Sequence, residues 1–223
     1  MSSLSQLSAL LSKDFRTEFR QRVLTAALLL FVGSACFSVY QVFFIGKARV
    51  NPLVWNSIFW LIILFSSFQV VARSFQAEME QRFWHYFFLV SPELLIVSKL
   101  IYHFLMFSVT GWLTWFLLSV FFRNPVQDTG LFSVALELGS LGLAAGLTLV
   151  SAISSKAGKN STLLPVLGFP LLIPTLLLVI RLSITALDGL DWSVAYNNML
   201  TLAGLDAIMI ALSLILFPYL WRS

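Results

Sequence analysis

Charged residues are scarce in this sequence of 223 residues. Asp, Glu, Lys and Arg make up 11% of the chain, whereas hydrophobic residues make up 59%. A soluble domain carries about 25% charged residues, so this chain has too little polar surface to cover a soluble globule. The composition therefore excludes an ordinary soluble protein and predicts an integral membrane protein.

Residues that carry chemistry are also scarce. The single cysteine, Cys36, excludes an intramolecular disulfide and a metal site made of cysteines alone, and its apolar surroundings favour a packing role. The two histidines, His85 and His103, have no Cys or carboxylate at metal-ligand spacing. His103 could ligate haem iron, although a lone helical His more commonly packs or forms a hydrogen bond. We therefore expect no bound metal.

Motifs for catalysis are absent too. The sequence has no paired-carboxylate or Ser-His-Asp arrangement, and it lacks the G-x-x-x-x-G-K-[ST] loop that cradles phosphates in P-loop ATPases. We expect that the chain is not an enzyme and that any ATP hydrolysis takes place in a partner chain.

The first 22 residues form a basic amphipathic segment. Its apolar residues recur at spacings of three and four, as in a helix; they are Leu4, Leu7, Leu11 and Phe15. Its basic residues are Lys13, Arg16, Arg20 and Arg22. This pattern predicts an interfacial helix over 1–22 that lies in the lipid headgroup plane; a mobile tail is the alternative. A mixed-charge segment of this length before the first apolar run does not fit a cleavable signal peptide.

Six hydrophobic segments follow, each close to the ~20 residues that cross ~30 Å of hydrocarbon. They run over 23–45, 53–71, 100–122, 131–153, 162–184 and 199–220. Because every backbone group in lipid needs a partner within its own segment, these segments are expected to be helices. The sequence predicts an all-α polytopic membrane protein with six transmembrane helices, in one transmembrane domain over 1–223.

Basic residues indicate the orientation. With the N-terminus in the cytoplasm, ten of the 14 Lys and Arg residues lie on the cytoplasmic side; they are Lys13, Arg16, Arg20, Arg22, Arg73, Arg82, Lys99, Lys156, Lys159 and Arg222. The other side has four, which are Lys47, Arg49, Arg123 and Arg181. This bias predicts that both termini are cytoplasmic. The net charge of +4 is then the usual attraction to anionic membrane lipid, and we expect no binding of nucleic acid.

The longest polar gap between hydrophobic segments runs over 73–99. It mixes charged residues with an aromatic group over 83–88, and the predicted orientation places it in the cytoplasm. Aromatic anchors surrounded by charges are typical of protein interfaces. We therefore predict a coupling loop that contacts a soluble partner through Arg73, Glu78, Glu80, Arg82, Phe83, Trp84 and Tyr86.

Three ionisable residues fall within the predicted spans. Glu137, Arg181 and Asp206 all fall at the same depth, in the outer third of the bilayer under this topology. Isolated charges are costly there, so pairing is expected. We hypothesise an ion pair between Arg181 and either Glu137 or Asp206; the alternative is that each side chain snorkels to the interface.

Small residues and prolines mark spans four and five. Gly142-x-x-x-Gly146 lets helix backbones approach closely, either inside one chain or at a dimer seam. Pro165, Pro170 and Pro174 predict a kinked or broken helix, a feature of transporters that hinge or line a path, although proline is common in membrane helices generally.

Several strings of residues carry a family resemblance. They are Asn51-Pro-Leu-Val-Trp55, Arg73-Ser-Phe75, Leu-Val-Ser-Pro92, Ser-Lys-Leu100, and the proline-rich run from Asn160 to Pro174. In order and spacing over nearly the whole chain, they resemble the CcmB family, haem exporter protein B. That family consists of membrane subunits of ABC-2-type transporters in cytochrome c maturation. The family's Gly-Ser/Thr-Leu-Glu run is replaced here by Arg82-Phe83-Trp84-His85.

The resemblance implies a function and a set of partners. It implies a permease subunit of an ABC complex in the bacterial inner membrane, with haem as cargo and no cofactor of its own. The implied partners are a P-loop ATPase, a haem-handling membrane protein, a haem chaperone and a second copy of the chain. Two other functions stay open: an ABC-2 permease for a lipid, glycan or drug, and a non-transporting scaffold through which an ATPase remodels a membrane complex.

Overall fold

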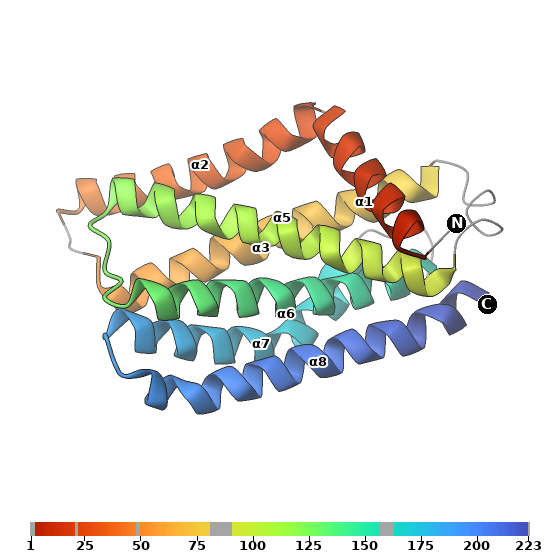
Figure 1. Cartoon of the computed structure of the whole chain (residues 1–223). Helices are drawn as coiled ribbons and strands as arrows, with labels where there is room; N and C mark the ends of the chain where they lie inside the picture. Colours follow the sequence, from red (N-terminus) through yellow and green to blue (C-terminus); the bar gives the residue numbers. More distant parts are fainter. Residues whose placement is uncertain (1–2, 21, 48–49, 81–90, 157–162, 223) are drawn as a thin grey trace.

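The computed structural model describes residues 3–20, 22–47, 50–80, 91–156 and 163–222, and α-helix is the only regular structure in these ranges (Figure 1). The helices are α1 (Ser3–Arg20), α2 (Arg22–Ile45), α3 (Pro52–Glu80), α5 (Pro92–Phe121), α6 (Thr129–Lys156), α7 (Leu163–Leu187) and α8 (Trp192–Arg222). The predicted all-α class is confirmed for the described residues.

Six of these helices are long and apolar enough to cross a membrane, as the sequence predicts. They are α2, α3, α5, α6, α7 and α8, and their apolar stretches are 20 to 30 residues long. Both chain termini lie at one end of the bundle (Figure 1), as an even number of crossings requires. We refer to this end as the termini end.

The polar gap predicted over 73–99 is shorter in the structure. α3 continues past its apolar stretch to Glu80, and α5 begins at Pro92. No Gly or Pro interrupts the segment from Arg73 to Glu80, and its Ala, Gln, Glu and Met residues favour helix. Proline suits the first turn of a helix, where no amide donor is needed. Lys99, predicted to end the gap, therefore lies inside α5.

The prolines of α7 do not break the helix. α7 is continuous from Leu163 to Leu187, so a break at Pro165, Pro170 and Pro174 is wrong, and the kink predicted as the other outcome stays a prediction. Pro165 lies in the first turn, where amide groups have no partner within the helix in any case. Pro170 and Pro174 each remove one internal hydrogen bond, a loss that membrane helices tolerate because neighbouring turns and helices compensate.

α6 is the central helix of the bundle. Its apolar stretch is 78% buried inside the chain, against 17% for α2. Gly139, Gly142 and Gly146 allow this burial, because a Cβ on Gly139 would lie 2.5 Å from a ring carbon of Trp60 and one on Gly146 would lie 2.7 Å from a methyl of Leu172. Of the two interpretations of the glycine pattern, the structure therefore shows close contact within the chain.

A polar seam joins α3 to α7 beside α6. The indole N–H of Trp60 donates a hydrogen bond to Ser183 Oγ at 3.0 Å, and Asn56 Nδ2 donates one to the backbone oxygen of Ile180 at 3.2 Å. Trp60 and Asn56 are both buried. Hydrogen bonds between membrane helices hold polar side chains in one orientation, so Trp60 has little freedom to move away from Gly139.

This packing predicts the effect of the smallest substitution at Gly139. Gly139→Ala should destabilise the protein by about 1–3 kcal/mol, because the added methyl overlaps the fixed Trp60 ring. Gly204→Ala in α8 is the matched control, because a Cβ there meets no atom within 4 Å, and it should be neutral or stabilising by up to about 1 kcal/mol. Denaturant-induced unfolding in detergent micelles measures both. Equal stabilities for the two variants would contradict this account of α6.

Candidate functional site

The candidate site lies at the termini end of the bundle, where α1 crosses the first turns of α5 (Figure 1). Leu10 of α1 packs in a cluster with Leu95 and Ile96 of α5. The ring of Phe15 lies edge-on to that of Tyr102, with 5.4 Å between the centroids. The amphipathic segment predicted over 1–22 is therefore a helix from Ser3 to Arg20, and its apolar side is turned toward α5.

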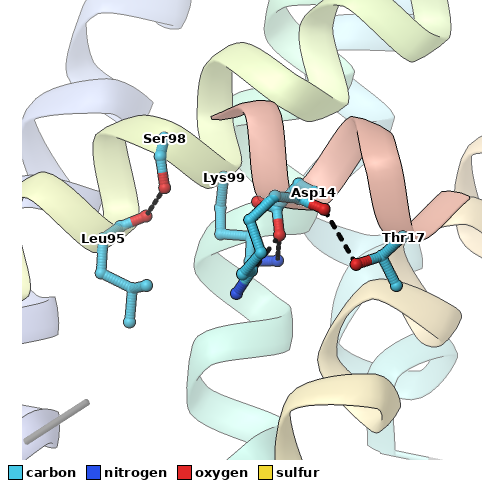
Figure 2. Close-up of polar contacts among 6 residues, drawn as sticks. Asp14, Thr17, Leu95, Ser98 and Lys99 are labelled. Carbon is cyan, nitrogen blue, oxygen red and sulfur yellow. Dashed lines mark hydrogen bonds and ion pairs between the residues drawn. The ribbon is translucent and has the colours of Figure 1, made fainter. Parts of the chain in front are cut away.

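A buried ion pair joins the two helices at this crossing. Lys99 Nζ of α5 donates a hydrogen bond to Asp14 Oδ1 of α1 at 3.1 Å (Figure 2). The two side chains are only 4% and 7% exposed. The neighbouring Lys13, which is 33% exposed, also approaches Asp14 Oδ1, at 3.5 Å. The ring of Tyr102 lies below the Lys99 ammonium, whose Nζ is 5.9 Å from the ring centroid.

Because the Asp14–Lys99 ion pair is buried, its stability depends strongly on its geometry. Removing two charges from water is costly, and their mutual attraction compensates only when the geometry is good. Removing one partner leaves the other charge buried and uncompensated, which typically costs about 3–5 kcal/mol. Asp14 and Lys99 therefore fix where α1 sits on α5, because a shift of α1 along α5 would separate the charges.

A second polar contact lies one helical turn farther along α5. His103 is fully buried, and its Nδ1 lies 2.8 Å from Thr148 Oγ1 of α6. Its ring stacks on Phe107, with 6.0 Å between the centroids and 10° between the planes. These contacts show the packing and the hydrogen bond expected of a lone histidine in a helix. Lys99 and His103 together link α1, α5 and α6 in sequence.

Sequence reasoning missed the ion pair. It treated Lys99 as the edge of a polar gap and did not single out Asp14. A signal was present, because Asp14 falls between Leu10, Leu11 and Phe15 on the apolar side of the predicted helix, where a carboxylate needs a partner. The identity of that partner depends on how α1 crosses α5, which no local pattern specifies.

The residues predicted to contact a soluble partner precede α5 in the sequence. The backbone places Arg73, Glu78 and Glu80 in the last turns of α3, beyond its apolar stretch. The other predicted docking residues lie outside the described residues; they are Arg82, Phe83, Trp84 and Tyr86.

The predicted ion pair of Arg181 is absent from the structure. Glu137 instead faces α5, where it accepts hydrogen bonds from Ser108 Oγ at 2.7 Å and from Trp112 Nε1 at 2.9 Å. Arg181 is exposed at the outside of α7, whereas Asp206 is buried. No ion pair joins Arg181 to either of these two carboxylates. The hypothesis is therefore wrong, because Glu137 bonds to α5, Arg181 is exposed, and Asp206 lies deeper in the bundle, beside Gly142 of α6 and Thr175 of α7.

The buried pair predicts strongly non-additive substitutions. Asp14→Leu or Lys99→Met alone should each destabilise the protein by about 3–5 kcal/mol, whereas the double variant should recover most of that loss, because no charge is left buried. Lys13→Ala, which removes the exposed neighbour, should cost at most about 1 kcal/mol. Unfolding in detergent of the wild type, the two single variants and the double variant gives the double-mutant cycle, with Lys13→Ala as the control. Additive losses from the two single substitutions would contradict a direct interaction.

One comparison with known proteins identifies the family. The model of the family described as CcmB protein matches residues 5–220, which is nearly the whole chain. No curated protein matches it. The match covers both helices of the candidate site and all six apolar helices, and it confirms the resemblance found in the sequence. The chain therefore belongs to the CcmB protein family, the membrane subunits of ABC-type haem exporters that act in cytochrome c maturation.

Proposed function

We propose that this chain passes conformational work from a separate ATPase to the membrane helices of the haem exporter. The observation that carries the proposal is the buried Asp14–Lys99 pair at the start of α5. Lys99 lies seven positions after Pro92, about 10 Å along the helix axis. A force applied just before Pro92 would therefore reach α1 through a rigid, charge-specific contact.

The docking surface we propose is the segment between α3 and α5. The last turns of α3 extend past its apolar stretch and carry Arg73, Glu78 and Glu80. Charged residues of this kind form the rim of an interface, and an aromatic group such as Phe83, Trp84 and Tyr86 supplies a buried anchor. With Arg82 beside them, these residues would contact a groove on the ATPase.

The proposed energy source is ATP hydrolysis by a second protein. The sequence contains no P-loop, so ATP hydrolysis would occur in a P-loop partner, and a dimer of this chain would face two ATPase subunits. The excess of basic residues supports a cytoplasmic termini end, and the family supports the bacterial inner membrane as the location of the bundle. α1 would then lie in the headgroup plane, with its basic residues toward anionic lipid and its apolar side on α5. A haem-handling membrane protein and a haem chaperone complete the proposed assembly.

The packing of the bundle interior favours a second candidate function, that of a scaffold that does not itself transport haem. Large apolar side chains fill the centre of the chain, among them Trp55, Phe59, Trp60, Phe107 and Phe132. Such filling argues against a porphyrin site among these side chains. A scaffold that uses the partner's ATP hydrolysis to remodel a haem-handling complex fits such a core. Transfer of haem across proteoliposomes that contain the whole complex distinguishes transport from remodelling.

The docking and coupling roles predict different defects. The double variant Glu78→Lys/Arg82→Glu should lose the ATPase during affinity purification, because the charges at the interface are inverted. The double variant Asp14→Leu/Lys99→Met should retain the ATPase, because it leaves the docking residues unchanged. It should lower the yield of c-type cytochrome about five- to 150-fold, which is the factor that corresponds to a typical coupling free energy between two sites. Co-purification and haem staining of complemented deletion strains measure the two effects.

Each role has its own contradicting outcome. Unchanged ATPase recovery by Glu78→Lys/Arg82→Glu would contradict the docking surface. A normal cytochrome yield with Asp14→Leu/Lys99→Met would contradict coupling through α1. Thermal unfolding of both proteins serves as the control, since each defect is informative only in a chain that is folded.

A further inference from the structure

Asp206 is a buried carboxyl group in α8 that the proposed coupling mechanism does not use. Its exposed fraction is 1%. Neither of its side-chain oxygens has a hydrogen-bond partner among the described residues. Buried polar groups are nearly always hydrogen-bonded, and an exception calls for an explanation.

The carboxyl group lies where three helices meet. A Cβ on Gly142 of α6 would lie 2.4 Å from Asp206 Oδ1 and 2.6 Å from Thr175 Cγ2 of α7. Thr175 is fully buried as well, and its Oγ1 also has no hydrogen-bond partner among the described residues. An acid from α8 and a hydroxyl-bearing side chain from α7 therefore approach the same glycine of α6.

No counter-charge faces Asp206 from the described parts of the helices packed against α8, which are α5, α6 and α7. Glu137 of α6 is turned toward α5, and Arg181 of α7 is exposed. The ionisable residues in the first half of α5 are Glu93, Lys99, Tyr102 and His103, and those of α8 itself include the exposed Tyr196 and Tyr219. None of the basic side chains among them forms an ion pair with Asp206.

These surroundings suit a neutral acid and not a carboxylate. An ionised carboxylate that is buried without a partner in a membrane bundle is very costly, whereas the neutral acid costs much less and can both donate and accept a hydrogen bond. A threonine hydroxyl can likewise donate or accept. The neutral acid of Asp206 and the hydroxyl of Thr175, both buried beside Gly142 without a partner among the described residues, are therefore chemically suited to bond to each other.

We propose that Asp206 and Thr175 form a proton-binding site inside the bundle. The carboxylate takes one proton from the aqueous phase to become the neutral acid, and the assembled bundle holds that form. Release of the proton restores a carboxylate that the contact among α6, α7 and α8 does not accommodate, so the contact loosens at Gly142. The site gives the bundle a packing state that depends on proton concentration. It is independent of the proposed ATPase docking surface, because it uses none of the same residues.

Infrared spectroscopy tests the protonation state directly. The full-length protein in lipid nanodiscs at neutral pH should show the carbonyl band of a protonated carboxylic acid. Asp206→Asn, a variant of nearly the same shape, should lack this band. Glu137→Gln is the matched control, because Glu137 is also intramembrane but accepts two hydrogen bonds, and this variant should keep the band. A wild-type protein without the band, or an Asp206→Asn variant that retains it, would overturn the proposal.

Thermal unfolding tests the link to packing. The melting temperature of the wild type should fall as the pH rises from mildly acidic to alkaline values, because ionisation of Asp206 opposes the folded bundle. Asp206→Asn should remain folded by circular dichroism and lose most of this dependence, while Glu137→Gln keeps it. The same dependence in Asp206→Asn as in the wild type would refute the site. So would a wild-type melting temperature that rises with sodium or potassium chloride but not with choline chloride, since a metal cation would then occupy it.

Discussion

The close approach of four helices to α6 is the constraint on which the rest of this structure depends. Helices in lipid gain little from hydrophobic burial against one another, because lipid tails are as apolar as leucine, so association depends on tight packing and on hydrogen bonds. Gly139 and Gly142 supply that packing by admitting Trp60 and Asp206 to the surface of α6. The hydrogen bond from Trp60 to Ser183 then holds α3 and α7 in the same arrangement.

At the termini end, an ion pair helps to set the position of a helix. α1 has no span of its own to hold it in the membrane, and its position depends on an apolar contact at Leu10 and on the ion pair of Asp14 with Lys99. Because such a pair tolerates little displacement, it is well suited to pass motion between an amphipathic helix and a transmembrane helix. This suits a family of membrane subunits of ABC-type haem exporters.

Predictions from the sequence succeeded where one segment decides the outcome by itself. The six apolar helices and the amphipathic α1 follow from hydrophobic length and from the spacing of Leu7, Leu11 and Phe15. Predictions that needed the direction of a side chain failed. The predicted spans put Glu137, Arg181 and Asp206 at one level, but α8 begins at Trp192 and Asp206 lies deeper, beside Gly142. The spans also do not tell that Glu137 faces α5 while Arg181 faces outward. The polar gap was also too long, because charge ends an apolar run without ending a helix, as the continuation of α3 to Glu80 shows.

The sequence by itself determined the class of protein, the number of membrane helices and the family, because each of these depends on the composition and order of residues along the chain. Only the tertiary structure decided which polar groups meet. Asp14 and Lys99 are 85 positions apart and come together because α1 crosses α5. Asp206 and Thr175 both reach the surface of α6 at Gly142 because this residue has no side chain in their way. A residue's neighbours within a helix follow from its spacing, whereas its partner across helices depends on how the whole bundle packs.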